Sequence, residues 1–154
     1  MAESSSRGSA GRHSSGGRSP GGRSARSDHS VVLDASAILA VLHGEPGQDQ
    51  IRERIRGADV RVGAVNVCEV SAKLSEAGLD KDEVREALGA LSPTVHPFDE
   101  ELALEAGALR PALSHRGLSL ADRACLALAN SLGVAAITTD SDWGELDRAE
   151  VIRG

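Results

Sequence analysis

Five acidic side chains stand at the exits of strand-like segments, or in the first turn of the helices that follow: Asp34, Glu69, Asp122, Asp140 and Asp142. Asp34, for example, directly follows the apolar run 31–33, which we expect to form a buried parallel strand because it is short and apolar on both faces. In a parallel sheet with right-handed crossovers, the strand exits lie on one edge. That edge is where ligands bind in open α/β sheets. The pattern therefore predicts that these carboxylates gather in one place.

A cluster of carboxylates is unfavourable unless something neutralises it. Two like charges 4 Å apart repel by about 4 kcal/mol at an effective dielectric constant of 20. Ligands that are all oxygen, with no His and no Cys among them, suit Mg²⁺ or Mn²⁺ better than zinc. A metal held by acids suits phosphate-ester hydrolysis, because it activates water, orients the phosphate and stabilises the leaving oxygen.

Each acid also has a purely structural interpretation. Asp34 is placed to cap the helix that follows it, and such a cap contributes about 1 kcal/mol. Glu69 follows Asn66 by three residues, and Asp122 follows Ser119 by three, which is capping-box spacing. If the acids only cap helices, Asp122→Asn changes stability by about 1 kcal/mol or less and leaves metal binding intact.

The segments that must position these acids alternate between strand-like and helix-like patterns. We expect strands at 31–33, 60–65, 94–98, 134–138 and 151–152, and helices at 35–42, 48–56, 66–77, 79–91, 99–113 and 119–132. The only aromatic residues are Phe98 and Trp143, so the core must consist of Val, Leu, Ile and Ala. This composition favours an α/β fold in which helices pack on a central parallel sheet, rather than a β-sandwich.

Charge divides the 154-residue chain unevenly. Residues 1–27 carry five arginines and one glutamate, which gives them a net charge of +4. Because the whole chain has a net charge of −6, residues 28–154 carry −10. We expect residues 1–28, rich in Ser, Gly and Arg, to be a disordered tail, because they cannot bury a core. The tail is either a solvated leader or a loose phosphate-binding arm. Residues 29–154 are expected to form one acidic domain, which excludes a nucleic-acid binder of the basic-patch kind.

The expected location is the cytoplasm, without contact with a membrane. No apolar run approaches the roughly 20 residues that cross a bilayer, and residues 1–27 lack the apolar region of a signal peptide. Cys68 and Cys125 have neither zinc-site nor C-x-x-C spacing, so we expect reduced thiols.

Four short motifs carry a family resemblance: Val-Leu-Asp34-Ala-Ser36-Ala, Asn-Val-Cys-Glu69-Val, Leu-Ser-Leu-Ala-Asp122-Arg-Ala-Cys and Ile-Thr-Thr-Asp140-Ser-Asp142-Trp. Each motif alone is weak. In this order, over about residues 30–154, they resemble PIN-domain nucleases, and among these the VapC-type ribonuclease toxins of type II toxin–antitoxin systems.

The resemblance implies a PIN-like three-layer fold and an endoribonuclease toxin that depends on Mg²⁺ or Mn²⁺. It assigns catalysis and metal binding to Asp34, Glu69, Asp122 and Asp140, with Asp142 as a further metal ligand and Ser36 and Thr138 as accessory hydroxyls. It also implies a cognate antitoxin, an RNA substrate and a homodimer.

Two interpretations stay open beside the resemblance. Arg116 and Arg123 are looser candidates for contact with RNA, and Arg123 fits an exposed helix surface equally well.

The chain is alternatively a PIN-like module that binds RNA or a protein partner without cutting. Metal-dependent cleavage that disappears on Asp34→Asn distinguishes the enzyme from the module.

Overall fold

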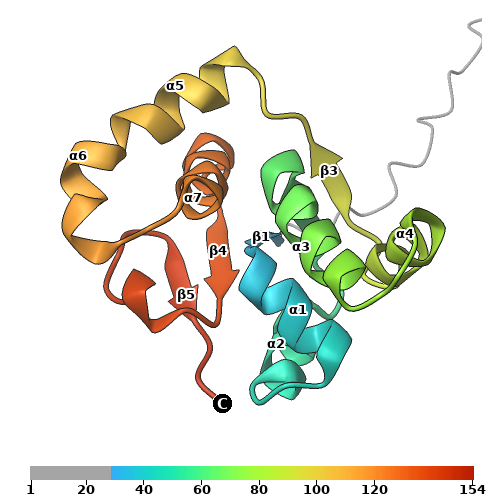
Figure 1. Ribbon diagram of the computed structural model, residues 1–154. Helices are drawn as coiled ribbons and strands as arrows, with labels where there is room; N and C mark the ends of the chain where they lie inside the picture. The colour runs from blue at the N-terminus through green and yellow to red at the C-terminus, as the bar shows by residue number, and fades with distance from the viewer. Residues whose placement is uncertain (1–28) are drawn as a thin grey trace, which may run out of the picture.

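The computed structural model describes residues 29–154 (Figure 1), so the predicted disorder of the 1–28 tail lies outside the described residues. Five parallel strands form one sheet in the order β3-β2-β1-β4-β5. The strands are β1 (Ser30–Leu33), β2 (Asp59–Gly63), β3 (Thr94–His96), β4 (Ala135–Thr138) and β5 (Ala149–Val151).

The direction of winding reverses at β1, the central strand. From β1 the chain builds β2 and β3 on one side of the sheet, and it later returns to build β4 and β5 on the other. Val31 pairs with Val60 of β2 and with Ala135 of β4. In open α/β sheets, ligands bind beyond the carboxyl end of the strand where the order reverses. Here that position is occupied by Asp34.

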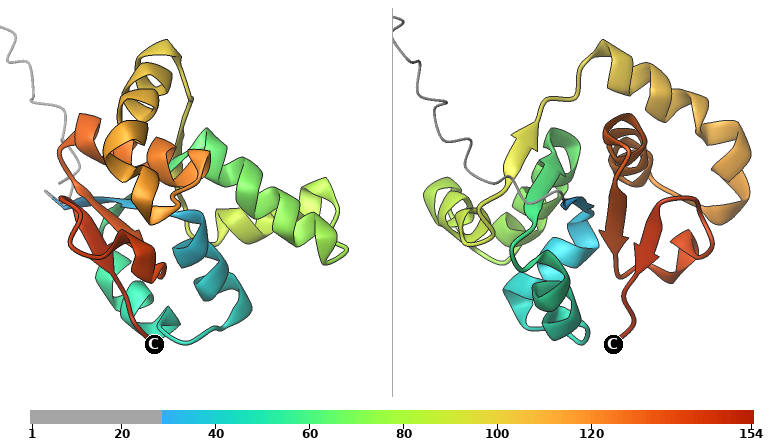
Figure 2. Two further views of the ribbon diagram at one scale, coloured as in Figure 1. Left: turned by 60° about the vertical axis from the view of Figure 1, so that its left-hand side comes forward. Right: turned by 180° about the vertical axis from the view of Figure 1, so that it is seen from behind.

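Within residues 29–154, seven helices cover the sheet: α1 (Ala35–His43), α2 (Gln48–Ile55), α3 (Ala64–Glu76), α4 (Lys81–Gly89), α5 (Glu100–Ala108), α6 (Arg110–Leu113) and α7 (Leu120–Leu132). Two short 3₁₀ turns are η1 (Ser114–Arg116) and η2 (Ser141–Trp143). Alternate strand residues face opposite sides. Val31 and Ile137 pack with α1–α4, whereas Val32 packs with α7 and the buried Trp143. Figure 1 shows α5–α7 on the left and α1–α4 on the right, and Figure 2 shows the same arrangement from two further sides. The predicted three-layer α/β fold is confirmed.

Three local predictions need correction. The expected helix 99–113 is divided into α5 and α6, because Pro111 cannot donate a helical hydrogen bond. The last strand is β5 at Ala149–Val151 rather than 151–152. The strand expected at 60–65 ends at Gly63, so α3 begins before Asn66 instead of at it.

The described part of the chain, residues 29–154, contains no helix that is both long and apolar enough to cross a bilayer.

Candidate functional site

Asp34 is a buried carboxylate held by three neutral donors. It lies just beyond β1 and is 2% exposed. Its Oδ2 accepts hydrogen bonds from Ser36 Oγ (2.7 Å) and Thr138 Oγ1 (2.9 Å), while its Oδ1 accepts one from Asn66 Nδ2 (3.3 Å). Asp34 occupies the N-cap position of α1, but its side chain makes no capping hydrogen bond. The structural interpretation of Asp34 as a helix cap is therefore wrong.

The two hydroxyls connect Asp34 to the segment that follows β4. Ser36 Oγ and Thr138 Oγ1 lie 3.0 Å apart, and Ser36 Oγ accepts a hydrogen bond from the amide N of Thr139 (3.0 Å). Thr138 Oγ1 accepts one from the amide N of Asp140 (3.0 Å). The strand exits of β1 and β4 are thus joined by one hydroxyl network, whose members the sequence motifs had singled out.

Asn66 is a member of this site that the sequence reasoning missed. It is fully buried in the first turns of α3, and its Nδ2 donates to Asp34 Oδ1 and to the carbonyl O of Ala121 (3.3 Å each). One amide therefore ties β1 to the start of α7. The predicted capping box between Asn66 and Glu69 is absent, because Gly63 is the N-cap residue of α3 and makes no side-chain cap. The only signal in the sequence that Asn66 is buried was its position between two apolar residues, Val65 and Val67.

Glu69 and Asp122 reach the same region from α3 and α7. Glu69 is half-buried, and its Oε2 is a buried oxygen that has no hydrogen-bond partner within the described part of the chain. Asp122 forms the predicted capping box, since its Oδ2 accepts a hydrogen bond from the amide N of Ser119 (2.7 Å) and its own amide N donates to Ser119 Oγ (3.1 Å). Asp122 thus has a structural role in addition to whatever chemistry it supports.

The pKa shifts show that three of the acids share one electrostatic environment. Burial raises the pKa of Asp34, the hydrogen bonds from Ser36 and Thr138 lower it, and the charge of Asp122 raises it again. Burial also raises the pKa of Glu69, with further increases from the charges of Asp34 and Asp122. The pKa of the buried Cys125 thiol is raised by burial first and then by the same three carboxylates. We call Asp34, Glu69 and Asp122 the acidic cluster.

Asp140 and Asp142 lie beside this cluster in a different arrangement. Asp140 Oδ1 accepts a hydrogen bond from the amide N of Asp142 (2.9 Å) and so caps η2. Asp140 is not among the charges that raise the pKa of Asp34 or Glu69. Asp142 is exposed. The structure therefore groups three of the five predicted acids electrostatically and connects Asp140 to them through Thr138.

The acidic cluster has donors of the kind that a hard divalent cation requires. Among residues 29–154, no three His, Cys, Asp or Glu side chains already surround a common point as metal ligands. However, Glu69 Oε2 is buried and unpartnered, and the donors that contact Asp34 within the described residues are uncharged. Carboxylate oxygens are the preferred ligands of Mg²⁺ and Mn²⁺. The donor set fits such an ion.

The two arginines considered for RNA contact have other partners. Arg123 is 8% exposed, and its Nη1 donates to the carbonyl O of Ala106 in α5 (3.0 Å), so it does not lie on the helix surface. Arg116 Nη1 donates to the carbonyl oxygens of Asp142 (3.2 Å) and Gly144 (3.3 Å). Arg116 thereby links the turn before α7 to the turn after β4.

Comparison with known proteins identifies related folds. Residues 31–149 match the family model described as "PIN domain". A toxin–antitoxin complex from Klebsiella pneumoniae is 18% identical, with a TM-score of 0.64, and the match covers 79% of this chain and 97% of that chain. The sarcin–ricin-loop-cleaving toxin VapC20 of Mycobacterium tuberculosis is also 18% identical, with a TM-score of 0.65 and coverage of 80% and 99%.

A DNA-bound VapBC structure from Salmonella typhimurium is 14% identical, with a TM-score of 0.62 and coverage of 81% and 98%. The search of curated protein sequences found no match. At these identities, the likeness to solved structures concerns the fold alone, and it agrees with the three-layer architecture predicted from the sequence.

Proposed function

The chain belongs to the PIN-domain family, and we propose that it is a metal-dependent endoribonuclease that acts as the toxin of a toxin–antitoxin pair. The observation that carries the proposal is the acidic cluster at the reversal point of the sheet. Asp34, Glu69 and Asp122 interact electrostatically there, and the pKa values of Asp34 and Glu69 are raised. Glu69 also presents a buried oxygen that has no hydrogen-bond partner among residues 29–154. Such an arrangement is stabilised by a bound cation.

In this proposal Asp34, Glu69 and Asp122 hold Mg²⁺ or Mn²⁺, and Asp140 and Asp142 supply further oxygens. The ion, when bound, activates water and stabilises the charge that develops on the scissile phosphate. The positive charge of the ion also offsets, locally at the site, part of the net charge of −10 on residues 28–154, which otherwise repels RNA.

The neighbouring side chains keep the ligands in place. Ser36, Thr138 and Asn66 fix the orientation of the Asp34 carboxylate, and the two hydroxyls favour its charged form. The capping box with Ser119 fixes Asp122 at the start of α7. A preorganised set of this kind needs no rearrangement at the moment of reaction.

The proposed partners are a cognate antitoxin, an RNA substrate and a second copy of the chain. Support for the antitoxin comes from structural neighbours whose descriptions name a toxin–antitoxin complex and VapBC assemblies. Support for RNA comes from the neighbour described as cleaving the sarcin–ricin loop. We propose the cytoplasm as its location, in line with the composition of the sequence.

The proposal is tested by incubating a mixed RNA pool with the protein, purified free of any antitoxin, in Mg²⁺, in Mn²⁺ and in chelator. Glu69→Gln is the most informative variant because, among the residues that the structure describes, no hydrogen bond to Glu69 Oε2 is lost. Glu76→Gln on the same helix is the matched control, since Glu76 is exposed and pairs with the exposed Lys73 (3.8 Å). We expect cleavage by the wild type and by Glu76→Gln only when metal is present, and none by Glu69→Gln.

Metal-independent cleavage, or equal cleavage by Glu69→Gln and wild type, contradicts the proposed site. A folded protein that binds RNA or an antitoxin but neither binds metal nor cuts is the binding module instead.

A further inference from the structure

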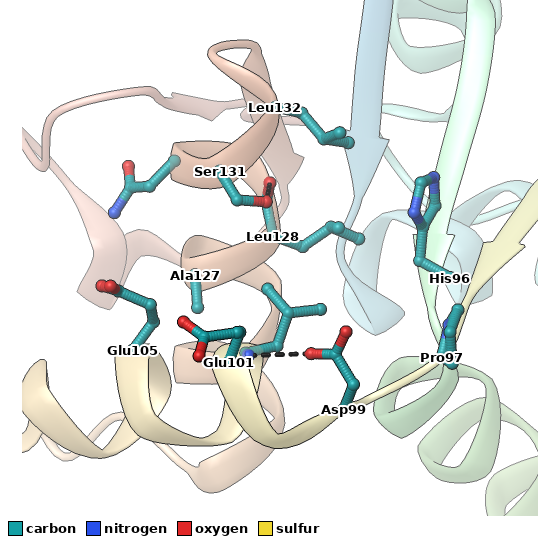
Figure 3. A pocket seen from close by; sticks show the side chains of 11 residues that line it. His96, Pro97, Asp99, Glu101, Glu105, Ala127, Leu128, Ser131 and Leu132 are labelled. Atoms are coloured by element: carbon teal, nitrogen blue, oxygen red, sulfur yellow. Dashed lines mark hydrogen bonds between the residues drawn. The ribbon is translucent and has the colours of Figure 1, made fainter.

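A groove of about 520 Å³ separates α5 from the C-terminal half of α7 and the end of β3. Its lining combines the apolar side chains of Leu102, Leu128 and Leu132 with polar and acidic side chains. Leu132 remains 38% exposed, which leaves part of this apolar surface open to solvent. Figure 3 shows Leu128 and Leu132 of α7 across from Glu101 and Glu105 of α5. The groove shares no lining residue with the acidic cluster.

The α5 wall of the groove is acidic and lacks cations. Asp99 Oδ1 accepts a hydrogen bond from the amide N of Leu102 (3.0 Å), drawn as a dashed line in Figure 3. Glu101 and Glu105 are exposed, and neither has a hydrogen bond or ion pair to any residue in the range 29–154. They are four residues apart on one helix, a spacing at which like charges repel. The groove is therefore complementary to a cation with an apolar stem.

We propose that this groove binds the arginine-rich N-terminal segment of the same chain, residues 1–28. The segment contains five arginines and no lysine: Arg7, Arg12, Arg18, Arg23 and Arg26. An arginine places its methylene stem on apolar surface while its guanidinium pairs with carboxylates. RNA does not suit the groove, because its phosphates carry the same sign of charge as Glu101 and Glu105.

The segment joins the described part of the chain near the groove. β1 begins at Ser30, and Val31 pairs with Ala135, three residues after Leu132 at the end of α7. The start of β1 and the Leu132 end of the groove therefore both lie near the amino-terminal end of the parallel strands. An extended chain spans up to about 3.3 Å per residue, so about ten residues span roughly 30 Å. The 28 residues of the segment are therefore long enough to run along the groove from the start of β1. Tethering also gives the segment an effective concentration in the millimolar range, an advantage over any separate basic peptide.

Paramagnetic broadening in the full-length chain tests this inference without any need for nuclease activity. A nitroxide is placed on Ser19→Cys in ¹⁵N-labelled protein that also carries Cys68→Ser, because Cys68 is exposed whereas Cys125 is buried. At low salt we expect the amide signals of 101–105 and 128–132 to lose more than half their intensity. At 1 M salt, where the Debye length falls to about 3 Å, the signals should recover.

Two pairs of substitutions make the test specific. Glu101→Gln with Glu105→Gln should abolish the broadening, because the acidic wall is removed. Glu76→Gln with Glu86→Gln removes the same charge from exposed positions on α3 and α4 and should leave it unchanged. Unaffected amide signals elsewhere establish that each variant is folded.

Three outcomes overturn the inference. The first is no broadening of the groove signals, or equal broadening at the exposed acidic residues of α4, which are Asp82, Glu83 and Glu86. The second is broadening around Asp34 and Asp122, which assigns the segment to the acidic cluster. The third outcome uses a mixture of two kinds of chain: one carries the nitroxide but no ¹⁵N, and the other carries ¹⁵N but no nitroxide. If the groove signals broaden only in this mixture, the groove binds the segment of a second copy.

Discussion

Replacing Thr138 by valine tests whether the hydroxyl network holds Asp34 in its ionised form. Thr138 is fully buried, and valine has nearly the same shape, so Thr138→Val leaves no cavity. What it removes is the hydrogen bond to Asp34 Oδ2 (2.9 Å), the one from the amide N of Asp140 (3.0 Å) and the contact with Ser36 Oγ (3.0 Å).

The magnitude follows from the kinds of hydrogen bond lost. A hydrogen bond to a charged group contributes about 1.5–3 kcal/mol, and a neutral one about 0.5–1.5 kcal/mol. Water can reach the half-buried Asp140 and replace part of the neutral bond. We therefore expect the free energy of unfolding of metal-free protein at pH 7 to fall by about 2–3 kcal/mol.

The loss should depend on pH. The hydrogen bond from Thr138 lowers the pKa of Asp34, so its removal raises that pKa further in the folded state. A raised folded pKa means that stability declines as pH rises from the ordinary aspartate pKa to the folded value. The difference between Thr138→Val and wild type should therefore be smallest in acid and largest above the folded pKa.

Urea denaturation of wild type, Thr138→Val and Thr139→Val measures the effect. Thr139→Val is the matched control, because the Thr139 hydroxyl makes no hydrogen bond within the described residues. A loss below about 0.5 kcal/mol for Thr138→Val, or an equal loss for the control, refutes the argument that the network stabilises charged Asp34.

Three further predictions follow from the same geometry. Asp122→Asn keeps an oxygen that can accept the hydrogen bond from Ser119, so we expect stability to change by about 1 kcal/mol or less. The substitution removes the negative charge, so Mn²⁺ affinity, measured by calorimetry, should fall at least tenfold. Unchanged affinity contradicts the role of Asp122 as a metal ligand. Trp143→Ala empties a fully buried position and should lower the free energy of unfolding by about 3–5 kcal/mol in urea titrations, whereas a loss under 1 kcal/mol is inconsistent with its burial. Burial and repulsion from Asp34 and Asp122 raise the pKa of Glu69, so the stability of metal-free protein should fall as pH rises from the ordinary glutamate pKa to the folded value. A pH series of urea midpoints should show a shallower fall for Glu69→Gln than for Glu76→Gln. Identical slopes contradict the electrostatic interaction of Glu69 with Asp34 and Asp122.

The position of Asp34 was predictable from the sequence, because a short apolar strand followed by an acid places that acid at the sheet edge in any parallel α/β fold. Asp122 was predictable for a similar local reason, since Ser119 and Asp122 have the spacing of the capping box that the structure contains. The division of the predicted helix 99–113 also had a local signal in Pro111.

Asn66 and Arg123 depend on contacts that local patterns do not encode. A difference of two residues in where α3 begins turns Asn66 from an expected cap into a buried bridge to Asp34 and Ala121. Arg123 is buried because α5, 17 residues earlier in the chain, offers it the carbonyl of Ala106. Tertiary packing decides both positions.

The most direct test of the central claim is a calorimetric titration of Mn²⁺ into wild type, Glu69→Gln and Glu76→Gln, with RNA cleavage measured on the same samples. If the acidic cluster is the metal site of a nuclease, Glu69→Gln binds Mn²⁺ at least tenfold more weakly and its cleavage rate falls in parallel, while Glu76→Gln matches wild type. Equal Mn²⁺ affinity in all three proteins, or cleavage that continues in chelator, contradicts it.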